Sequence, residues 1–574
     1  MNINEKYNLW VTKATDDVDL INELNDIKND DKAIEDRFYK DLSFGTGGLR
    51  GVIGAGTNRI NIYTVRKITQ GLSIHLLNKT NHPKVCISYD SRIKSKLFAC
   101  EVARVLCANN IHVYLVRELM PVPFVSYTTR KLGCSAGIMI TASHNPSKYN
   151  GYKVYGSDGN QITLEDAQSI LEKINNIDCF NDVNIMSLED GFNNGLVEYI
   201  SEDIVNAYEE STLSLSIIGR EKIKNSKIVY TPLHGSGLRM VTDVLRKDGF
   251  TDINIVNEQS FPDGNFPTVD KPNPEEQEAL KLGVELAKKI NADLVLATDP
   301  DCDRVGIAVR KNNEYILPNG NEIGILLFDF ICKNLIKNNK MPASPIVLKT
   351  IVTTEMLYAV AKKYGVQVID TLTGFKFLGE QICLLKDKGE EDRYIFAMEE
   401  SYGYLSSKEV FDKDGVNACL LICEMYEYYS SKNINLIDQL ENLYKEFGYY
   451  QTELNYYVFE GVKGDKIMKN IMKELHNHKL EKLLPSKVVE YYDYLSSKMT
   501  NSNNEVTKLT LPKSDVLKYV MEDKNSFVIR PSGTEPKIKI YYTVKENTRE
   551  ECEKSLKTLK NVLSNFINEY SKEK

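Results

Sequence analysis

Short apolar runs alternate with helical segments along most of this chain, and this alternation constrains its fold more than any other feature. The apolar runs 85–89, 113–116 and 137–140 are predicted strands, and 96–108 is a predicted helix between the first two. The same order restarts at 227–230, and once more further along the chain. Because strands that alternate with helices are typical of mostly parallel sheets covered by helices, the sequence predicts three successive α/β units.

Length and a late change in this pattern predict four domains. The 574 residues are enough for about four domains of roughly 150 residues each. From about residue 450 the strands and helices follow a different order and end in the predicted helix 549–569. We therefore expect three similar mixed α/β domains and a distinct α+β C-terminal domain. The expected bounds are 1–210, 211–320, 321–445 and 446–574.

Composition narrows the class of protein. Hydrophobic residues make up 42% and charged residues 26%, the balance of a globular protein in water. The net charge of −8 argues against a nucleic-acid partner. The eleven cysteines are scattered without a C-x-x-C pair, which indicates free thiols. Because neither a signal peptide nor a membrane-spanning segment is apparent, we expect a cytoplasmic protein that does not bind membranes.

Ser143 stands in the segment Thr141–Pro146, directly after the predicted strand 137–140. A serine displayed there can be a nucleophile for acyl transfer or a carrier of phosphate. The nucleophile elbow G-x-S-x-G is absent, because Thr141 and Asn145 occupy the glycine positions, and this disfavours acyl transfer. We expect His144 to point away from Ser143 at a strand end; a purely structural role for this histidine is an equal alternative.

Three alternating carboxylates, Asp299, Asp301 and Asp303, follow the predicted strand 294–297. In an extended segment they would share one face, where they would repel one another unless a hard cation neutralised them. An EF-hand is excluded because Arg304 replaces its glycine. A solvated acidic turn is the alternative. Since Mg²⁺ usually binds one or two carboxylates together with phosphates, a phosphate ligand is expected nearby.

Three further polar segments also follow apolar runs or turns. Arg530–Pro536 combines a guanidinium, hydroxyls and a glycine, which suits a phosphate dianion. Glu399, Glu400 and Ser401 suit sugar hydroxyls, and a structural cap is the alternative. The segment Thr373–Lys376 is a less specific signal for a binding site, because a Thr-Gly turn followed by lysine is common. Since ligands bind outside the carboxyl ends of strands in open α/β sheets, these loops are expected to meet in one cleft.

The glycine-rich segment Phe44–Gly51 is expected to be a flexible loop. Its spacing is not G-x-G-x-x-G, and no clear strand precedes it, so a dinucleotide-binding fingerprint is excluded. Arg50 within it could reach a phosphate or a sugar.

Together these motifs resemble the α-D-phosphohexomutase superfamily. Thr141–Pro146 resembles its phosphoserine loop, Asp299–Arg304 its metal loop, Glu399–Ser401 its sugar-binding loop, and Arg530–Thr534 its phosphate-binding loop. The segment 44–59 further resembles the phosphoglucomutase/phosphopentomutase branch, which includes bacterial phosphoglucomutases. The resemblance implies four domains around a central cleft.

The resemblance also implies roles for individual residues. Mg²⁺, one ion per site, would be bound by Ser143, Asp299, Asp301 and Asp303. The catalytic residues would be Ser143, His144, Lys153 and Arg50. Substrate would be bound by Thr373, Gly374, Lys376, Glu399, Ser401, Arg530, Ser532, Gly533 and Thr534. The histidine that some phosphomannomutases place after the sugar-loop serine is replaced by Tyr402-Gly403-Tyr404, so the general base stays unassigned, with Lys376 and His144 as candidates.

The expected reaction interconverts glucose 1-phosphate and glucose 6-phosphate through a phosphoserine enzyme and a bisphosphorylated sugar. A sugar 1,6-bisphosphate would serve as primer. Phosphoryl transfer needs positioning and charge neutralisation more than covalent assistance, and the site must exclude water to protect the phosphoserine. Mannose or pentose phosphates are alternative substrates, because specificity rests on a few hydroxyl contacts. A metal-dependent sugar phosphatase and a sugar-phosphate-binding regulator are alternative functions.

Overall fold

The computed structural model describes residues 1–45, 47–220, 222–459, 461–532 and 537–571. The chain divides into two compact units. The first unit comprises Met1–Gly320, Leu378–Ala397 and Ser401–Asn433, and the second comprises Asn321–Phe377, Met398–Glu400 and Ile434–Lys574.

Three capped helices open the chain. They are α1 (Ile3–Lys13), α2 (Val18–Asp26) and α3 (Asp31–Phe38). Each begins after a side chain that accepts a backbone hydrogen bond from its first turn: Asn2, Asp17 and Asp30. The buried ring of Trp10 packs edge-on against Phe38 and Tyr63, so these helices share a core with the helix that follows.

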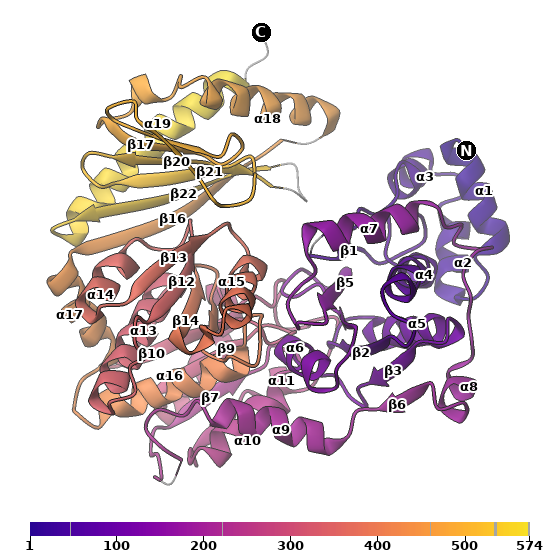
Figure 1. The fold of residues 1–574 in the computed structure, drawn as a ribbon, viewed down its shortest axis with the longest axis horizontal. Helices are drawn as coiled ribbons and strands as arrows, with labels where there is room; N and C mark the ends of the chain where they lie inside the picture. Colours follow the sequence, from indigo (N-terminus) through magenta and orange to yellow (C-terminus); the bar gives the residue numbers. More distant parts are fainter. Residues whose placement is uncertain (46, 221, 460, 533–536, 572–574) are drawn as a thin grey trace. The chain divides into compact units, whose positions relative to one another are not determined.

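A six-stranded sheet follows, with the strand order β1-β5-β4-β2-β3-β6. Its strands are β1 (Leu49–Val52), β2 (Lys84–Tyr89), β3 (His112–Leu115), β4 (Ala136–Ile140), β5 (Tyr149–Gly156) and β6 (Val197–Tyr199). The accompanying helices are α4 (Ile62–Lys79), α5 (Ser95–Ala108), α6 (Val122–Lys131), α7 (Leu164–Asn175), α8 (Leu188–Asn193) and α9 (Glu202–Leu213) (Figure 1). The predicted strands β2, β3 and β4 are confirmed and pair in parallel.

The prediction that Phe44–Gly51 is a flexible loop is wrong for its last residues. Leu49–Val52 is the edge strand β1, which pairs antiparallel with β5. Gly151 permits this close pairing, because a Cβ there would lie 2.4 Å from the Thr141 carbonyl oxygen and 2.7 Å from that of Leu49. Tertiary pairing, rather than a local pattern, therefore makes this segment a strand.

The second sheet has the order β11-β10-β9-β7-β8. Its strands are β7 (Ile228–Thr231), β8 (Ile253–Ile255), β9 (Leu294–Thr298), β10 (Val305–Lys311) and β11 (Glu314–Ile316), with helices α10 (Leu238–Lys247), α11 (Asn257–Ser260) and α12 (Gln277–Ile290). The late helix α16 (Gly415–Ser430) packs against α10, β9 and β10, so the chain returns to this sheet.

The third sheet has the order β13-β12-β14-β15. Its strands are β12 (Ile346–Thr350), β13 (Gln367–Thr371), β14 (Tyr394–Glu399) and β15 (Gly403–Leu405), with helices α13 (Gly320–Lys337), α14 (Met356–Tyr364), α15 (Phe375–Asp387) and α17 (Leu436–Phe447). Strands β12 and β13 pair in parallel, as the predicted alternation requires.

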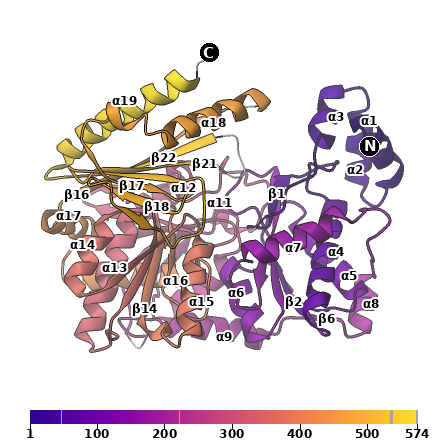
Figure 2. The same ribbon diagram turned by 45° about the horizontal axis from the view of Figure 1, so that its top comes forward.

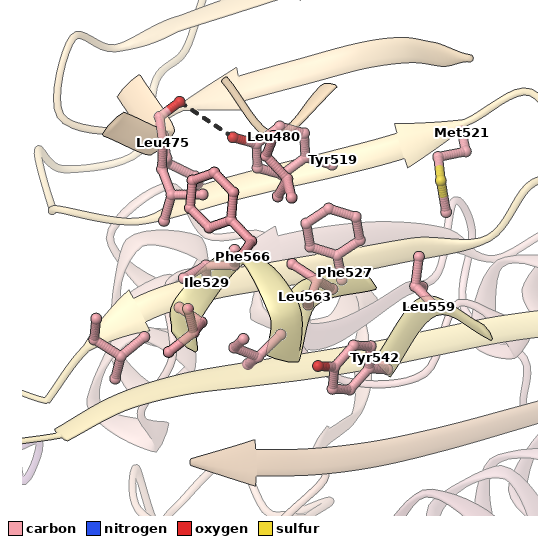
Figure 3. Close-up of a cluster of buried hydrophobic side chains, with 14 of the residues drawn as sticks. Leu475, Leu480, Tyr519, Met521, Phe527, Ile529, Tyr542, Leu559, Leu563 and Phe566 are labelled. Atoms are coloured by element: carbon pink, nitrogen blue, oxygen red, sulfur yellow. Dashed lines mark hydrogen bonds between the residues drawn. The ribbon is translucent and has the colours of Figure 1, made fainter. Parts of the chain in front are cut away.

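The C-terminal sheet differs from the others, as predicted, and its order is β16-β22-β21-β20-β17-β18-β19. Its strands are β16 (Tyr449–Val458), β17 (Val488–Asp493), β18 (Lys498–Asn501), β19 (Val506–Lys508), β20 (Leu517–Met521), β21 (Ser526–Pro531) and β22 (Lys537–Glu546), and their paired neighbours run antiparallel. Helices α18 (Gly461–His476) and α19 (Arg549–Ser571) lie on one face of this sheet (Figure 2). Between them, Tyr519, Phe527, Leu563 and Phe566 form a buried cluster (Figure 3).

Two expectations from composition concern the whole chain. All eleven cysteines are free thiols. Within the described ranges, none of the helices has both the length and the apolar character that crossing a bilayer would require.

Candidate active site

Ser143 lies in the loop after β4, and its side chain is only 2% exposed. Its φ of 53° falls in the left-handed region, which is uncommon for residues other than glycine. The hydroxyl donates to Asp299 Oδ2 at 2.8 Å and lies 3.1 Å from His144 Nδ1. The expectation that His144 points away from Ser143 is therefore wrong, because the left-handed turn at Ser143 replaces the extended backbone on which that expectation rested.

Two residues that sequence reasoning missed support this loop from the end of β2. The backbone N–H of Ser143 donates to Thr141 Oγ1 at 2.8 Å, and that hydroxyl donates to Asp90 Oδ2 at 2.6 Å. The guanidinium of Arg92 donates to the carbonyl oxygen of Ser143 at 2.5 Å. The strand-end rule could have found both residues, because Asp90 and Arg92 directly follow β2, which pairs with β4.

The three aspartates converge as predicted, but on a turn rather than an extended segment. Cys302, between Asp301 and Asp303, has a φ of 53° and reverses the chain. All three carboxylates are buried, and one oxygen from each lies within 4.8 Å of the others. The Oδ1 atoms of Asp301 and Asp303 are buried and accept no hydrogen bond from the part of the chain that the structure describes. Buried, unsatisfied carboxylate oxygens at this spacing fit a hard divalent cation.

Two ammonium groups partly balance the aspartates. Lys153 Nζ lies 2.8 Å from Asp301 Oδ2 and 3.3 Å from Asp303 Oδ2, and Lys413 Nζ lies 3.2 Å from the latter atom. Burial and the neighbouring Asp301 and Asp303 raise the pKa of Asp299 well above its ordinary value. Burial also acts to raise the pKa of Asp303, but Lys413 and Lys153 outweigh it, and the net shift is downward. The trio therefore resists full ionisation without an additional cation.

Lys413 and Asp412 were also missed by sequence reasoning. Asp412 accepts hydrogen bonds from Tyr155 Oη and Gln161 Nε2, both at 2.9 Å, and its other oxygen lies 3.2 Å from Lys413 Nζ. These contacts fix the ammonium beside Asp303. No motif signals the pair, which precedes α16 and lies more than a hundred residues from the aspartates.

His144 and Arg50 lie around the same loop. Burial, followed by the guanidiniums of Arg304 and Arg50, lowers the pKa of His144 well below its ordinary value, so the imidazole is neutral at neutral pH. Arg50 is exposed on β1 and donates to Asn145 Oδ1 at 3.1 Å. The predicted catalytic residues of the first unit are thus brought together: Ser143, His144, Lys153 and Arg50.

The predicted sugar-binding residues fall in both units. In the second unit, Glu399 is buried at the end of β14. Thr373 Oγ1 is buried and, within the described ranges, has no hydrogen-bond partner. Gly374 has a φ of 118°, and Lys376 Nζ lies 4.8 Å from the centre of the Phe377 ring. In the first unit, the carbonyl oxygen of Ser401 accepts a hydrogen bond from Arg304 at 3.0 Å.

The predicted phosphate loop begins inside β21. Arg530 pairs across the sheet with Lys539 of β22, so a second cation that sequence reasoning missed shares its row. Arg530 Nε is buried and has no hydrogen-bond partner among the described residues, which suits a group that binds an anion. The N–H of Ser532 donates to the carbonyl oxygen of Lys537 at 2.8 Å. Gly533 and Thr534 lie outside the described residues.

Comparison with protein families gives three successive matches. The models for α/β/α domains I, II and III of phosphoglucomutase/phosphomannomutase match residues 41–180, 206–312 and 319–447. The chain is 35% identical over 529 residues to a phosphoglucomutase of Staphylococcus saprophyticus, covering 92% of this chain and 94% of the relative. It is also 35% identical to a phosphoglucomutase of Staphylococcus aureus, with 94% and 95% covered.

Solved structures share the fold. A phosphoglucomutase from Paramecium, parafusin, in its open form matches with a TM-score of 0.65 at 18% identity, over 93% of this chain and 95% of the other. A phosphoglucomutase/phosphomannomutase family protein from Burkholderia thailandensis matches with a TM-score of 0.64 at 17% identity, over 91% and 97%.

Proposed function

Because the chain belongs to the phosphoglucomutase/phosphomannomutase family, we propose that it interconverts glucose 1-phosphate and glucose 6-phosphate through a phosphoserine enzyme. It is a phosphohexomutase of the isomerase class. Glucose is the preferred sugar in this proposal because the relatives named above are phosphoglucomutases. Sugar phosphates are then its small-molecule partners. A cytoplasmic location is part of the proposal and is supported by the eleven free thiols, which suit a reducing compartment.

The contact between Ser143 and Asp299 carries the proposal. It places a buried hydroxyl 2.8 Å from a carboxylate of the trio that fits a divalent cation. We assign Ser143, Asp299, Asp301 and Asp303 as ligands of Mg²⁺, which when bound would neutralise phosphate charge. A hydroxyl beside such a trio suits reversible phosphoryl transfer better than acyl transfer.

The chain's own residues would act on the phosphoryl group as follows. In one half-reaction the bond from phosphorus to Ser143 Oγ breaks, and a bond to the free sugar hydroxyl forms as that hydroxyl loses its proton. In the other half-reaction the second phosphoryl group of the bisphosphate returns to Ser143. Lys153 and Arg50 would stabilise the transferring group, because charge neutralisation dominates phosphoryl transfer. A sugar 1,6-bisphosphate would load the serine initially.

The neutral imidazole of His144 suits proton transfer at Ser143 Oγ, 3.1 Å away. At the sugar, we assign hydroxyl contacts to Thr373, Gly374, Lys376, Glu399 and Ser401. The phosphate that is not reacting would be bound by Arg530, Ser532, Gly533 and Thr534. This assignment is supported by Arg530 Nε, which is buried and has no partner among the residues that the structure describes. The base that removes the sugar proton stays unassigned.

The experiment compares the wild type with Ser143→Ala and with Ser147→Ala, a matched control in the same loop. Formation of glucose 6-phosphate from glucose 1-phosphate is followed with a coupled dehydrogenase, in the presence of Mg²⁺ and glucose 1,6-bisphosphate. We expect activity in the wild type and in Ser147→Ala, and none in Ser143→Ala, whose circular dichroism should be unchanged. Wild-type-like mutase activity in Ser143→Ala would refute the phosphoserine mechanism.

The same assay distinguishes the other candidate reactions. Mannose, ribose and deoxyribose 1-phosphates are compared with glucose 1-phosphate, and the preferred sugar has the highest kcat/KM. Steady release of inorganic phosphate without isomerisation would instead indicate a phosphatase.

A further inference from the structure

We propose that Arg92 is a positioning residue that fixes the backbone of the phosphoserine loop, an inference that rests on the proposed function. Arg92 follows β2 and is 3% exposed. Its Nη1 donates to the carbonyl oxygens of Pro146 and Tyr149, both at 3.0 Å. Its Nη2 donates to the carbonyl oxygens of Ser143 and Asn145. One side chain thus binds four carbonyls spread over residues 143–149.

The loop depends on these bonds because its own backbone is strained. Ser143 has a left-handed φ of 53°, which is unfavourable for a residue with a Cβ and persists only where the surroundings enforce it. The loop lies between β4 and β5, and its internal backbone hydrogen bonds are those of two turns, from the N–H of Asn145 to Ala142 and from the N–H of Tyr149 to Pro146. A planar guanidinium presents its donors in a rigid fork, which a lysine ammonium cannot reproduce.

Arg92 is itself held on one side by Asp90. The Nε atom of Arg92 lies 3.4 Å from Asp90 Oδ2, and Asp90 Oδ1 accepts hydrogen bonds from the Arg92 backbone and from Ser95. The hydroxyl of Thr141 also donates to Asp90. Asp90 therefore binds the start of the loop through Thr141, and Arg92 binds carbonyl oxygens along its length.

The segment between α11 and α12 contacts the guanidinium of Arg92 on another side. The Arg92 Cζ atom lies 5.0 Å from the ring centre of Phe266, which is buried. The backbones of Arg92 and Gly264 form an isolated bridge. Any Cβ at Gly264 would lie 2.3 Å from the Ile93 nitrogen, so this packing requires glycine. The stack and the bridge therefore restrict the position of the Arg92 side chain.

This arrangement predicts an effect on turnover rather than on substrate affinity. The Nη1 and Nη2 atoms of Arg92 donate to carbonyl oxygens of the loop, and Arg92 is not among the residues that we assign to the substrate. Its loss would therefore move Ser143 Oγ away from Asp299 without removing a substrate contact. Because phosphoryl transfer depends on alignment, a displacement of about 1 Å can lower the rate by about 100-fold.

The test uses Arg92→Lys, with Arg66→Lys as the matched control. Arg66 is also 3% exposed, and it donates to Glu101 and Asp16 outside the loop. In the mutase assay we expect Arg92→Lys to lower kcat by about 10- to 100-fold with KM unchanged. Arg66→Lys should lower only the melting temperature. Amide hydrogen exchange of residues 141–150 should rise in Arg92→Lys and not in Arg66→Lys.

Phe266→Leu provides a second variant should Arg92→Lys fail to fold, and we expect it to lower kcat less than Arg92→Lys. Equal kcat in the Arg92 and Arg66 variants, a change confined to KM, or unchanged exchange in the loop would each overturn the proposal. In the fallback case, an unchanged kcat in Phe266→Leu would do the same. If the wild type lacks mutase activity, the proposed function fails, whereas the exchange comparison still decides whether Arg92 fixes the loop.

Discussion

Replacing Asp414 by Asn tests whether a buried carboxyl group beside the metal loop makes stability depend on pH. Asp414 is 1% exposed and caps α16, where Oδ1 accepts from the N–H of Asn417 at 2.9 Å. The hydroxyl of Tyr208 donates to both carboxyl oxygens, at 3.0 and 3.1 Å. Burial raises the pKa of Asp414 from its ordinary value of 3.8 to about 6, because it outweighs the hydrogen bonds from Asn417, Tyr208 and Val416, which act to lower the pKa.

The direction of the pH effect on stability follows from the difference in proton binding between the folded and unfolded states. Because the pKa is raised in the folded state, the folded protein holds this proton more tightly than the unfolded chain does. The contribution of Asp414 to stability is therefore greatest below about pH 4 and declines as the pH rises through about 6. A rise of about two pKa units corresponds to about 3 kcal/mol in total. Of this, about 1.3 kcal/mol should be lost between pH 5 and pH 7.

The assay is urea unfolding of the wild type and Asp414→Asn at pH 5, 6 and 7. Asn is neutral throughout and retains an oxygen that can accept from Asn417 and Tyr208, so the stability difference between the two proteins isolates the titration. We expect Asp414→Asn to gain about 1.3 kcal/mol relative to the wild type over this range. Asp30→Asn, an exposed cap of α3, is the control and should show no such gain. A pH-independent difference at Asp414 would refute the reasoning.

Two further substitutions test packing. Gly415→Ala would place a Cβ 2.5 Å from the Cys302 carbonyl oxygen and so displace the metal loop. We expect this variant to bind Mg²⁺ about tenfold more weakly, as measured by calorimetry. An unchanged affinity for Mg²⁺ would contradict this expectation. Leu563→Ala removes a fully buried side chain that packs against the C-terminal sheet, and it should lower the free energy of unfolding by about 2–5 kcal/mol. Leu164→Ala, at a position that is 62% exposed, is the control and should change the free energy of unfolding little. Equal effects of the two substitutions would contradict this packing.

Much of the fold was predictable because hydrophobic periodicity is local. The strand 137–140 and the helix 96–108 were predicted from a few neighbouring residues, and both are present as β4 and α5. The edge strand β1 could not, because Leu49–Val52 becomes a strand only by pairing with β5, about a hundred residues later. The packing of α16 against the second sheet was not predicted either, because it also depends on contacts between segments far apart in the sequence. The four-domain bounds stay a prediction.

The site was predictable where several polar groups stand together after a strand. Asp299, Asp301 and Asp303 are such a group, and they do converge. Two residues that bind segments far from them in the sequence were missed. Lys413 belongs to no motif, and Arg92 could have been found only from its place directly after β2. Their roles depend on which strands and helices meet, which one sequence does not reveal.

The backbone of the site explains why its local geometry was misjudged. Three of the loops that carry chemistry contain a left-handed residue other than glycine: Ser143, Cys302 and Tyr402, with φ of 53°, 53° and 64°. Each has its carbonyl oxygen bound from elsewhere in the chain, by Arg92, by the N–H of Gly415 at 3.1 Å and by the N–H of Val305 at 3.1 Å.

A residue with a Cβ is unfavourable in the left-handed region, so local preference argues for the extended strand ends that the sequence predicts. The distant donors reverse that preference, because a carbonyl turned out of the regular path would otherwise be buried without a partner. Strained backbone of this kind is typical of functional sites. The same bonds that made the loops unpredictable hold Ser143 and the aspartates at the separation that the proposed phosphoryl transfer requires.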